Sequence, residues 1–260
     1  MLYIIQTALQ LGCVYSFVAL ALFLSYRILD IADLTTDGCF VLGMAVSVSC
    51  CASGHPFAGV ILGMIAGGCA GCVTAILQTQ LGVPSILAGI VTNTGLYTIN
   101  LMAMGWSSNI SLLKNETIFS LFKKINIGGA WNAIILAGMI ALCAMVLMKW
   151  FLSTRLGLSI RATGDNRDMV SASSINPRFT ILVGLVVANM FTGLSGALAG
   201  QLQKSADINA GSGIVTIGLA TLIIGETLIQ GRKSIGRNIC ACLVGNIVYR
   251  CIYAFVLQTH

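Results

Sequence analysis

Residues 180–201 read TILVGLVVANMFTGLSGALAGQ and carry no charged side chain. A helix needs about 20 mostly apolar residues to cross a bilayer, so this run is long enough to span one. The whole chain has the same character, because 57% of its 260 residues are hydrophobic and only 8% are charged. Soluble domains carry about 25% charged residues. The sequence therefore predicts a membrane protein.

Other apolar blocks lie on both sides of this run. The long ones are residues 3–26, 57–79, 84–104, 129–152 and 238–257. Residues 38–53 are short for a full crossing and predict a broken or re-entrant element, which must be covered by protein or line a cavity. Residues 212–230 are long enough but contain Glu226. We therefore expect an all-α, polytopic membrane protein with about eight transmembrane helices, forming a single domain over residues 1–260.

Basic residues predict the orientation of these segments. The net charge is +6, but the basic residues are dispersed in loops, which does not indicate a nucleic-acid-binding protein. If residues 161–178 are cytoplasmic, the loops of that side contain Arg27, Lys149, Arg155, Arg161, Arg167, Arg178, Arg232, Lys233 and Arg237. The other side has only Lys114, Lys123, Lys124 and Lys204. This bias follows the positive-inside rule and places both termini outside.

Small residues predict how the helices pack. Gly59, Gly63, Gly67 and Gly71 repeat at every fourth position, a spacing that lets helices approach closely in lipid. We interpret them as packing within one chain rather than as a dimer face. Ten cysteines lie in or beside apolar segments, and Cys69 and Cys72 have no second Cys or His pair that would complete a zinc site. We expect no metal site and no catalytic residue.

Three acids, Asp30, Asp33 and Asp37, follow the first apolar block. Their spacing is compatible with a metal or proton site. The alternative is a solvated loop in which Asp37 or Thr36 caps the next helix, because an acid at a helix N-terminus interacts favourably with the helix dipole.

Polar residues also lie inside the apolar blocks. Asn93, Tyr97 and Asn100 share one face of a helix by their spacing, and they either line a substrate pathway or hold helices together. Glu226 and Arg250 need a partner or water at membrane depth, through an ion pair, snorkelling or transport chemistry.

The polar run RATGDNRDMVSASSINPR, residues 161–178, separates two apolar blocks. It predicts a short helix with Asp165 as N-cap and Asp168 at the third position, beside the positive helix end. Pro177 limits this helix to about Asn176. A capped polar helix in a cytoplasmic loop, about residues 153–179, would offer a rigid surface to a soluble partner.

These stretches identify a family. The chain resembles permease subunits of ABC importers, in the ribose and branched-chain amino acid permease group, and is most similar to tryptophan/tyrosine-type and uncharacterised uptake permeases. The matching stretches are RILDIADLTTDG (27–38), GVPSILAGIVTNTGLYTINLMAMG (82–105), RATGDNRDMVSASSIN (161–176) and GLATLIIGETLIQGRKSIG (218–236). Such permeases usually have another apolar helix after the last block, so we expect either a shortened protein or a truncated chain.

The resemblance implies a function and partners. The polar run would be a coupling helix that docks into the ATPase subunit, with Asp168 at the Glu position and Ser174 at the Gly position of the importer signature. The coupling residues would be Gly164, Asp165, Asn166, Asp168, Ser174 and Asn176. A second permease copy and an extracytoplasmic binding protein would complete an importer of a small solute in the bacterial plasma (inner) membrane. ATP and Mg²⁺ would be bound by the ATPase, so this subunit would contain no cofactor and would not be an enzyme.

Two rival functions remain open from the residues. In an ion-coupled secondary transporter, Asp30, Asp33, Asp37, Glu226 and Arg250 would form the ion path. A non-transporting membrane scaffold would recruit a cytosolic partner through the same polar loop. The sequence does not name the solute, although the subgroup suggests an aromatic amino acid.

Overall fold

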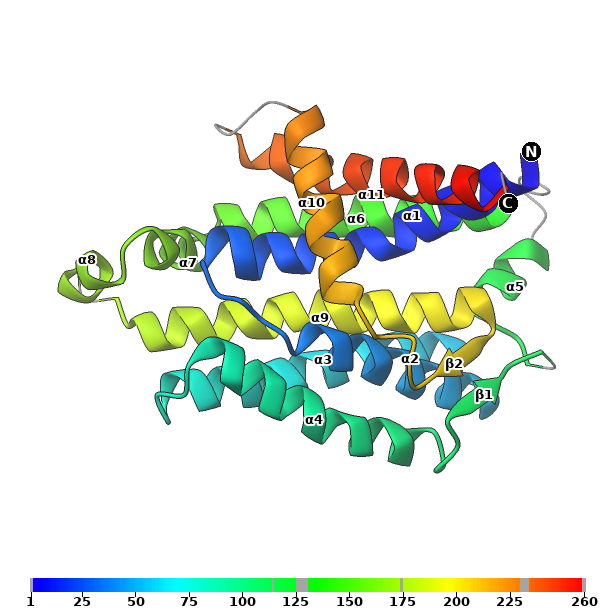
Figure 1. Ribbon diagram of the computed structural model, residues 1–260, viewed down its shortest axis with the longest axis horizontal. Helices are drawn as coiled ribbons and strands as arrows, with labels where there is room; N and C mark the ends of the chain where they lie inside the picture. The colour runs from blue at the N-terminus through cyan, green and yellow to red at the C-terminus, as the bar shows by residue number, and fades with distance from the viewer. Residues whose placement is uncertain (1, 114, 125–130, 174, 230–233, 259–260) are drawn as a thin grey trace.

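The computed structural model describes residues 2–113, 115–124, 131–173, 175–229 and 234–258. These residues form helices and one small antiparallel sheet (Figure 1). The helices are α1 (Leu2–Leu22), the π-helix η1 (Phe23–Ile28), α2 (Thr36–Ala52), α3 (Pro56–Thr79), α4 (Ser85–Ala103), α5 (Ile118–Lys124), α6 (Asn132–Ser153), α7 (Arg155–Asp165), α8 (Arg167–Ala172), α9 (Pro177–Gln203), α10 (Ile214–Leu228) and α11 (Ile235–Gln258). The strands are β1 (Asn109–Ser111) and β2 (Ser205–Asp207).

The long apolar blocks became helices that are long enough to cross a membrane. The described residues contain six such spans, Ile5–Ile28, Pro56–Thr79, Ser85–Ala103, Asn132–Ser153, Pro177–Gln203 and Ile235–Val256. The two weaker blocks became the shorter apolar helices α2 and α10. At 1.5 Å per residue these are about 25 Å and about 22 Å long, less than the roughly 30 Å of a bilayer core. The all-α, polytopic membrane fold is confirmed.

The two short helices begin midway along the bundle (Figure 1). Figure 1 shows α2 starting near the middle of the long axis and running toward the end that holds β1 and β2. The helix α10 also starts near the middle and crosses the long helices steeply. Each is preceded by non-helical chain, residues 29–35 before α2 and residues 208–213 before α10. Their N-termini therefore lie midway along the bundle instead of at one of its ends (Figure 1).

Close packing between α3 and α9 forms the centre of the molecule. A Cβ added at Gly67 would lie 2.9 Å from Gly193 Cα, and one at Gly63 would lie 2.8 Å from Gly43 O on α2. Such distances leave no room for a side chain, so the glycines let three helix backbones touch. The glycine repeat therefore serves packing within one chain, as the sequence analysis proposed.

The two ends of the bundle differ in structure. The N- and C-terminal ends of the chain lie at the same end as α5, β1 and β2, whereas α7 and α8 project from the opposite end (Figure 1). Strands β1 and β2 pair with Asn109 opposite Asp207 and Ser111 opposite Ser205. This arrangement agrees with the expectation that both termini lie on one side of the membrane and the polar run on the other.

Candidate functional site

A pocket of about 360 Å³ lies where α2, α4 and the segment before α10 meet. Its lining includes Asp37, Gly38, Val41, Asn93, Thr94, Tyr97, Asn100, Ile208, Asn209, Gly211 and Ser212. Amide, hydroxyl and carboxylate groups therefore gather at one place in a mostly apolar bundle. Among the described residues that line it, Asp37 is the one with a charge.

The structure brings together all three polar residues that the sequence placed on one face of α4. Tyr97 is 52% exposed, whereas Asn100 is only 2% exposed. The Nδ2 of Asn100 donates a hydrogen bond of 3.2 Å to the carbonyl of Gly38, but its Oδ1 has no partner among the described residues. Asn93 completes the set in the same pocket. Their place on a substrate pathway stays a prediction.

Asp37 occupies a different position from the one expected. It lies in the first turn of α2, but Thr35 precedes that helix and no side chain caps its N-terminus. The Asp37 Oδ1 instead accepts a hydrogen bond of 2.9 Å from the backbone N–H of Val215, in the first turn of α10. The expectation that Asp37 or Thr36 caps α2 was wrong. A tertiary contact instead turns the Asp37 carboxylate toward α10.

The other two acids of the group have separate environments. Asp33 is 3% exposed and its carboxylate accepts hydrogen bonds from the Thr35 N–H (2.9 Å) and from Asn189 Nδ2 (2.7 Å). Asp30 is exposed and adopts a left-handed conformation, with φ of 54°. The three carboxylates therefore do not converge, and the described residues contain no group of three His, Cys, Asp or Glu side chains that could hold a metal ion.

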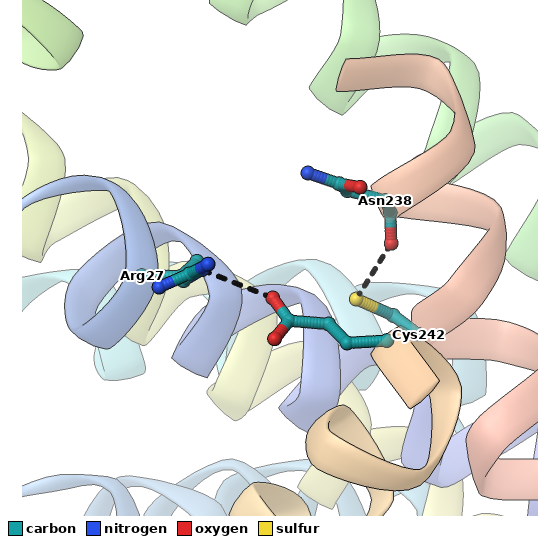
Figure 2. Close-up of polar contacts among 4 residues, drawn as sticks. Arg27, Asn238 and Cys242 are labelled. Atoms are coloured by element: carbon teal, nitrogen blue, oxygen red, sulfur yellow. Dashed lines mark hydrogen bonds and ion pairs between the residues drawn. The ribbon is translucent and has the colours of Figure 1, made fainter. Parts of the chain in front are cut away.

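The charges within the apolar segments also have local partners. Arg27 at the end of η1 pairs with Glu226 of α10, with 3.1 Å between Arg27 Nε and Glu226 Oε1 (Figure 2). In the same region the Cys242 thiol contacts the carbonyl of Asn238 (Figure 2). The Arg250 guanidinium carbon lies 3.8 Å from the centre of the Tyr15 ring, a cation–π contact. Glu226 and Arg250 therefore have different partners and do not form one ion path.

The polar run folds into two helices and not one. Asp165 is the last residue of α7, and Asn166 is the N-cap of α8, where its Oδ1 accepts a hydrogen bond of 3.0 Å from the Met169 N–H. Asp168 is the second residue of α8, not the third. The predicted Asp165 cap was thus displaced by one residue, because Asn166 has the extended backbone that a cap requires.

Pro177 starts the next helix and does not end the short polar helix α8. The helix α8 already ends at Ala172, and Asn176 caps α9 by accepting a hydrogen bond of 3.0 Å from the Arg178 N–H. Pro177 is then the first residue of α9, where its missing N–H costs nothing. Ser174 lies outside the described residues.

The helix α7 is attached tightly to the membrane helices. A Cβ added at Gly164 would collide with the carbonyl oxygen of Ile28, at the end of η1. The residue directly before Gly164, Thr163, has its hydroxyl 2.8 Å from the hydroxyl of Thr180 of α9. The Gly164 contact gave no signal in the sequence beyond the glycine itself. The helix α7 is therefore in direct contact with both η1 and α9.

Comparisons with known proteins agree with this architecture. The family described as "Branched-chain amino acid transport system / permease component" matches residues 4–259. The tyrosine transport system permease protein of Clostridioides difficile is 31% identical over 246 residues, which cover 94% of this chain and 80% of that protein. An uncharacterized protein of Rickettsia prowazekii is 32% identical over 252 residues (95% and 86%). The D-allose transport system permease protein of Escherichia coli is 30% identical over 220 residues (83% and 64%). No solved structure shows a significant match.

Proposed function

The chain belongs to the family of branched-chain amino acid transport system permease components, and from this membership we propose that it works as the membrane-spanning subunit of an ATP-driven importer of amino acids. It is a multi-pass permease of the bacterial inner membrane, of the ABC type that transports small solutes. The observation that carries the proposal is the presence, in one permease, of a polar pocket among the helices and of a polar helix pair at one end whose first helix, α7, packs tightly on the membrane helices.

The helix pair α7–α8 is proposed as the docking site for an ATPase subunit. The coupling residues are Gly164, Asp165, Asn166, Asp168, Ser174 and Asn176. Of the described members, Asp165, Asn166, Asp168 and Asn176 are exposed, as docking residues must be. Gly164 has a separate role, because its contact with Ile28 passes movement of α7 to the membrane helices. The whole chain would act as one permease domain, with the coupling loop at about residues 153–179.

The pocket beside α4 is proposed as part of the solute pathway, with Asn93, Tyr97 and Asn100 in its wall. Similarity to a tyrosine permease favours an aromatic amino acid as the solute. An aromatic ring in the pocket, Tyr97, is able to pack against such a solute.

The remaining partners follow from the architecture of an importer. An extracytoplasmic binding protein would deliver the solute, and a second permease copy would complete the pathway. The helix α4 exposes several apolar side chains, including Ile86, Ile90 and Met102, and these are available to the second copy or to lipid. ATP and Mg²⁺ would be bound by the ATPase, and no nucleic acid is involved.

Reconstitution tests this function. The permease should co-purify with a P-loop ATPase encoded beside it, and proteoliposomes containing both, supplied with the neighbouring binding protein, should take up labelled L-tyrosine only with ATP. Uptake that follows an ion gradient without ATP would instead make the protein a secondary transporter. Normal co-purification without uptake of any amino acid would leave the importer in place but contradict the substrate class.

A further inference from the structure

The N-terminus of α10 is occupied by a carboxylate from another helix. Gly213 precedes α10 with a φ of 81° and offers no side chain, so α10 has no cap of its own. Asp37 accepts the hydrogen bond from Val215, and the amides of Gly213 and Ile214 interact with the same carboxylate. A helix N-terminus binds carboxylates well, because its free N–H groups and its dipole both favour negative charge.

A second group in the same pocket lacks a partner. Asn100 is 2% exposed and lines the pocket, and its Oδ1 is a buried acceptor with no donor among the described residues. Leaving a buried acceptor unsatisfied costs free energy, so this atom favours a ligand that brings an N–H or O–H donor. A carboxylate has no such donor, but an ammonium group does.

Resting on the proposed importer function, we propose that this pocket binds the zwitterionic backbone of an amino acid, and that Asp37 occupies the carboxylate position until the solute arrives. The solute's carboxylate takes the amides at the start of α10. Its ammonium group pairs with the displaced Asp37 and donates to Asn100 Oδ1. The exchange leaves no charge unpaired, because the solute's carboxylate gains the amides of α10 while the displaced Asp37 gains the ammonium group.

This exchange also gives the solute a structural effect. Asp37 on α2 and Val215 on α10 join the two short helices across 178 residues of sequence. Displacement of Asp37 breaks this direct link and replaces it with one through the solute. A neutral sugar would not do so, because its hydroxyls are weaker partners for helix amides than a carboxylate is.

Competition binding tests the proposal. Labelled L-tyrosine is bound to the permease–ATPase complex in nanodiscs and displaced by tyramine, which lacks the carboxylate, by 3-(4-hydroxyphenyl)propionate, which lacks the ammonium group, or by D-allose. Both tyrosine analogues should compete at least about tenfold more weakly than L-tyrosine, because each lacks one charge-assisted hydrogen-bonding group. D-allose should compete more weakly still.

Variants separate the roles of the two groups. Asp37→Asn should lower the affinity for L-tyrosine at least about tenfold, because the partner of the ammonium group is gone. L-Tyrosine should then bind no more tightly than 3-(4-hydroxyphenyl)propionate. Asn100→Leu should weaken L-tyrosine and tyramine but not the propionate, and it carries the test if Asp37→Asn does not fold. Asp30→Asn is the matched control, since this exposed residue has a left-handed backbone that Asn also accepts, and it should bind as wild type.

The result that overturns the proposal is wild-type affinity for L-tyrosine in both Asp37→Asn and Asn100→Leu, or competition by D-allose equal to that by L-tyrosine. ATP-driven uptake in the same preparations distinguishes this failure from failure of the importer function. ATP-driven L-tyrosine uptake that is insensitive to both substitutions overturns the pocket proposal while the importer stands.

Discussion

The side-chain amide of Asn189, in α9, donates a hydrogen bond of 2.7 Å to the carboxylate of Asp33, which lies 156 residues earlier in the chain. Both residues are buried, at 1% and 3% exposure. The adjacent Thr35 hydroxyl lies 2.8 Å from the Thr74 hydroxyl of α3. The non-helical segment before α2 is thus attached to both central helices, which holds the start of α2 at its depth in the bundle.

The first prediction concerns this buried acid. Asn189→Leu should destabilise the protein by about 1–3 kcal/mol, because it leaves the Asp33 carboxylate with one hydrogen bond fewer in a buried site. Thermal unfolding of the detergent-solubilised protein, followed by size-exclusion chromatography, measures the change. Thr192→Val on the same helix is the control. Its buried hydroxyl donates to Ala188 O of its own helix and to no other group among the described residues, so little change is expected. Equal unfolding temperatures for both variants would show that the Asp33 contact contributes nothing.

The second prediction concerns the contact between α7 and η1. Gly164→Ala should destabilise the protein by about 1–3 kcal/mol. Its methyl group would collide with Ile28 O, a backbone atom that cannot move aside as a flexible side chain could. Gly138→Ala in α6 is the matched control, because open space surrounds that position and Ala favours helix by up to about 1 kcal/mol. Thermal unfolding should separate the two variants in opposite directions. A Gly164→Ala protein as stable as wild type would contradict the tight attachment of α7.

The third prediction concerns ATPase docking. Asp168 is exposed in the first turn of α8, and Asp168→Lys should weaken ATPase co-purification or uncouple ATP hydrolysis from uptake. Reversing a charge at a docked acid typically costs about 2–5 kcal/mol, because the partner group is left unpaired or repelled. Asp207→Lys, on β2 at the opposite end of the bundle, should co-purify normally. If docking and uptake stay at the wild-type level both in Asp168→Lys and after a Gly-Ser replacement of residues 166–174, α8 has no role in ATPase docking.

The fourth prediction concerns topology. Ser108, directly before β1, and Ser171, in α8, are both exposed, and β1 and α8 lie at opposite ends of the bundle (Figure 1). On a cysteine-free background, Ser108→Cys should react with an impermeant thiol reagent added to intact cells, whereas Ser171→Cys should react only after permeabilisation, because basic loops stay in the cytoplasm. The reverse pattern would invert the orientation of every helix.

The fifth prediction concerns the α4 wall of the pocket. Asn93→Leu should reduce solute uptake by about tenfold or more while the complex still assembles, since it removes a polar group that faces the pocket. Thr98→Val on the same helix is the control, because Thr98 is exposed and does not line the pocket. If Asn93→Leu, Tyr97→Leu and Asn100→Leu all transport at the wild-type rate, these residues do not lie on the solute pathway.

The membrane fold could be predicted from the sequence because hydrophobic length is a local property. Each apolar block is contiguous, so its length shows directly whether a helix can cross the bilayer. The same holds for the shortness of α2 and for the shared face of Asn93, Tyr97 and Asn100, which depends only on helical spacing. The boundaries within residues 161–178 were less certain, since Asp165 and Asn166 are both good caps and only the backbone conformation selects between them.

The partners of the acids were decided by tertiary structure alone. Asp37 with Val215, Asp33 with Asn189 and Arg27 with Glu226 each join segments that are far apart in the chain. Spacing in the sequence was compatible with a joint site of Asp30, Asp33 and Asp37, but the fold turns each toward a different environment. Buried charges and amides must find partners wherever packing leaves them, and that packing depends on which helices the glycines of α3 and α9 allow to touch.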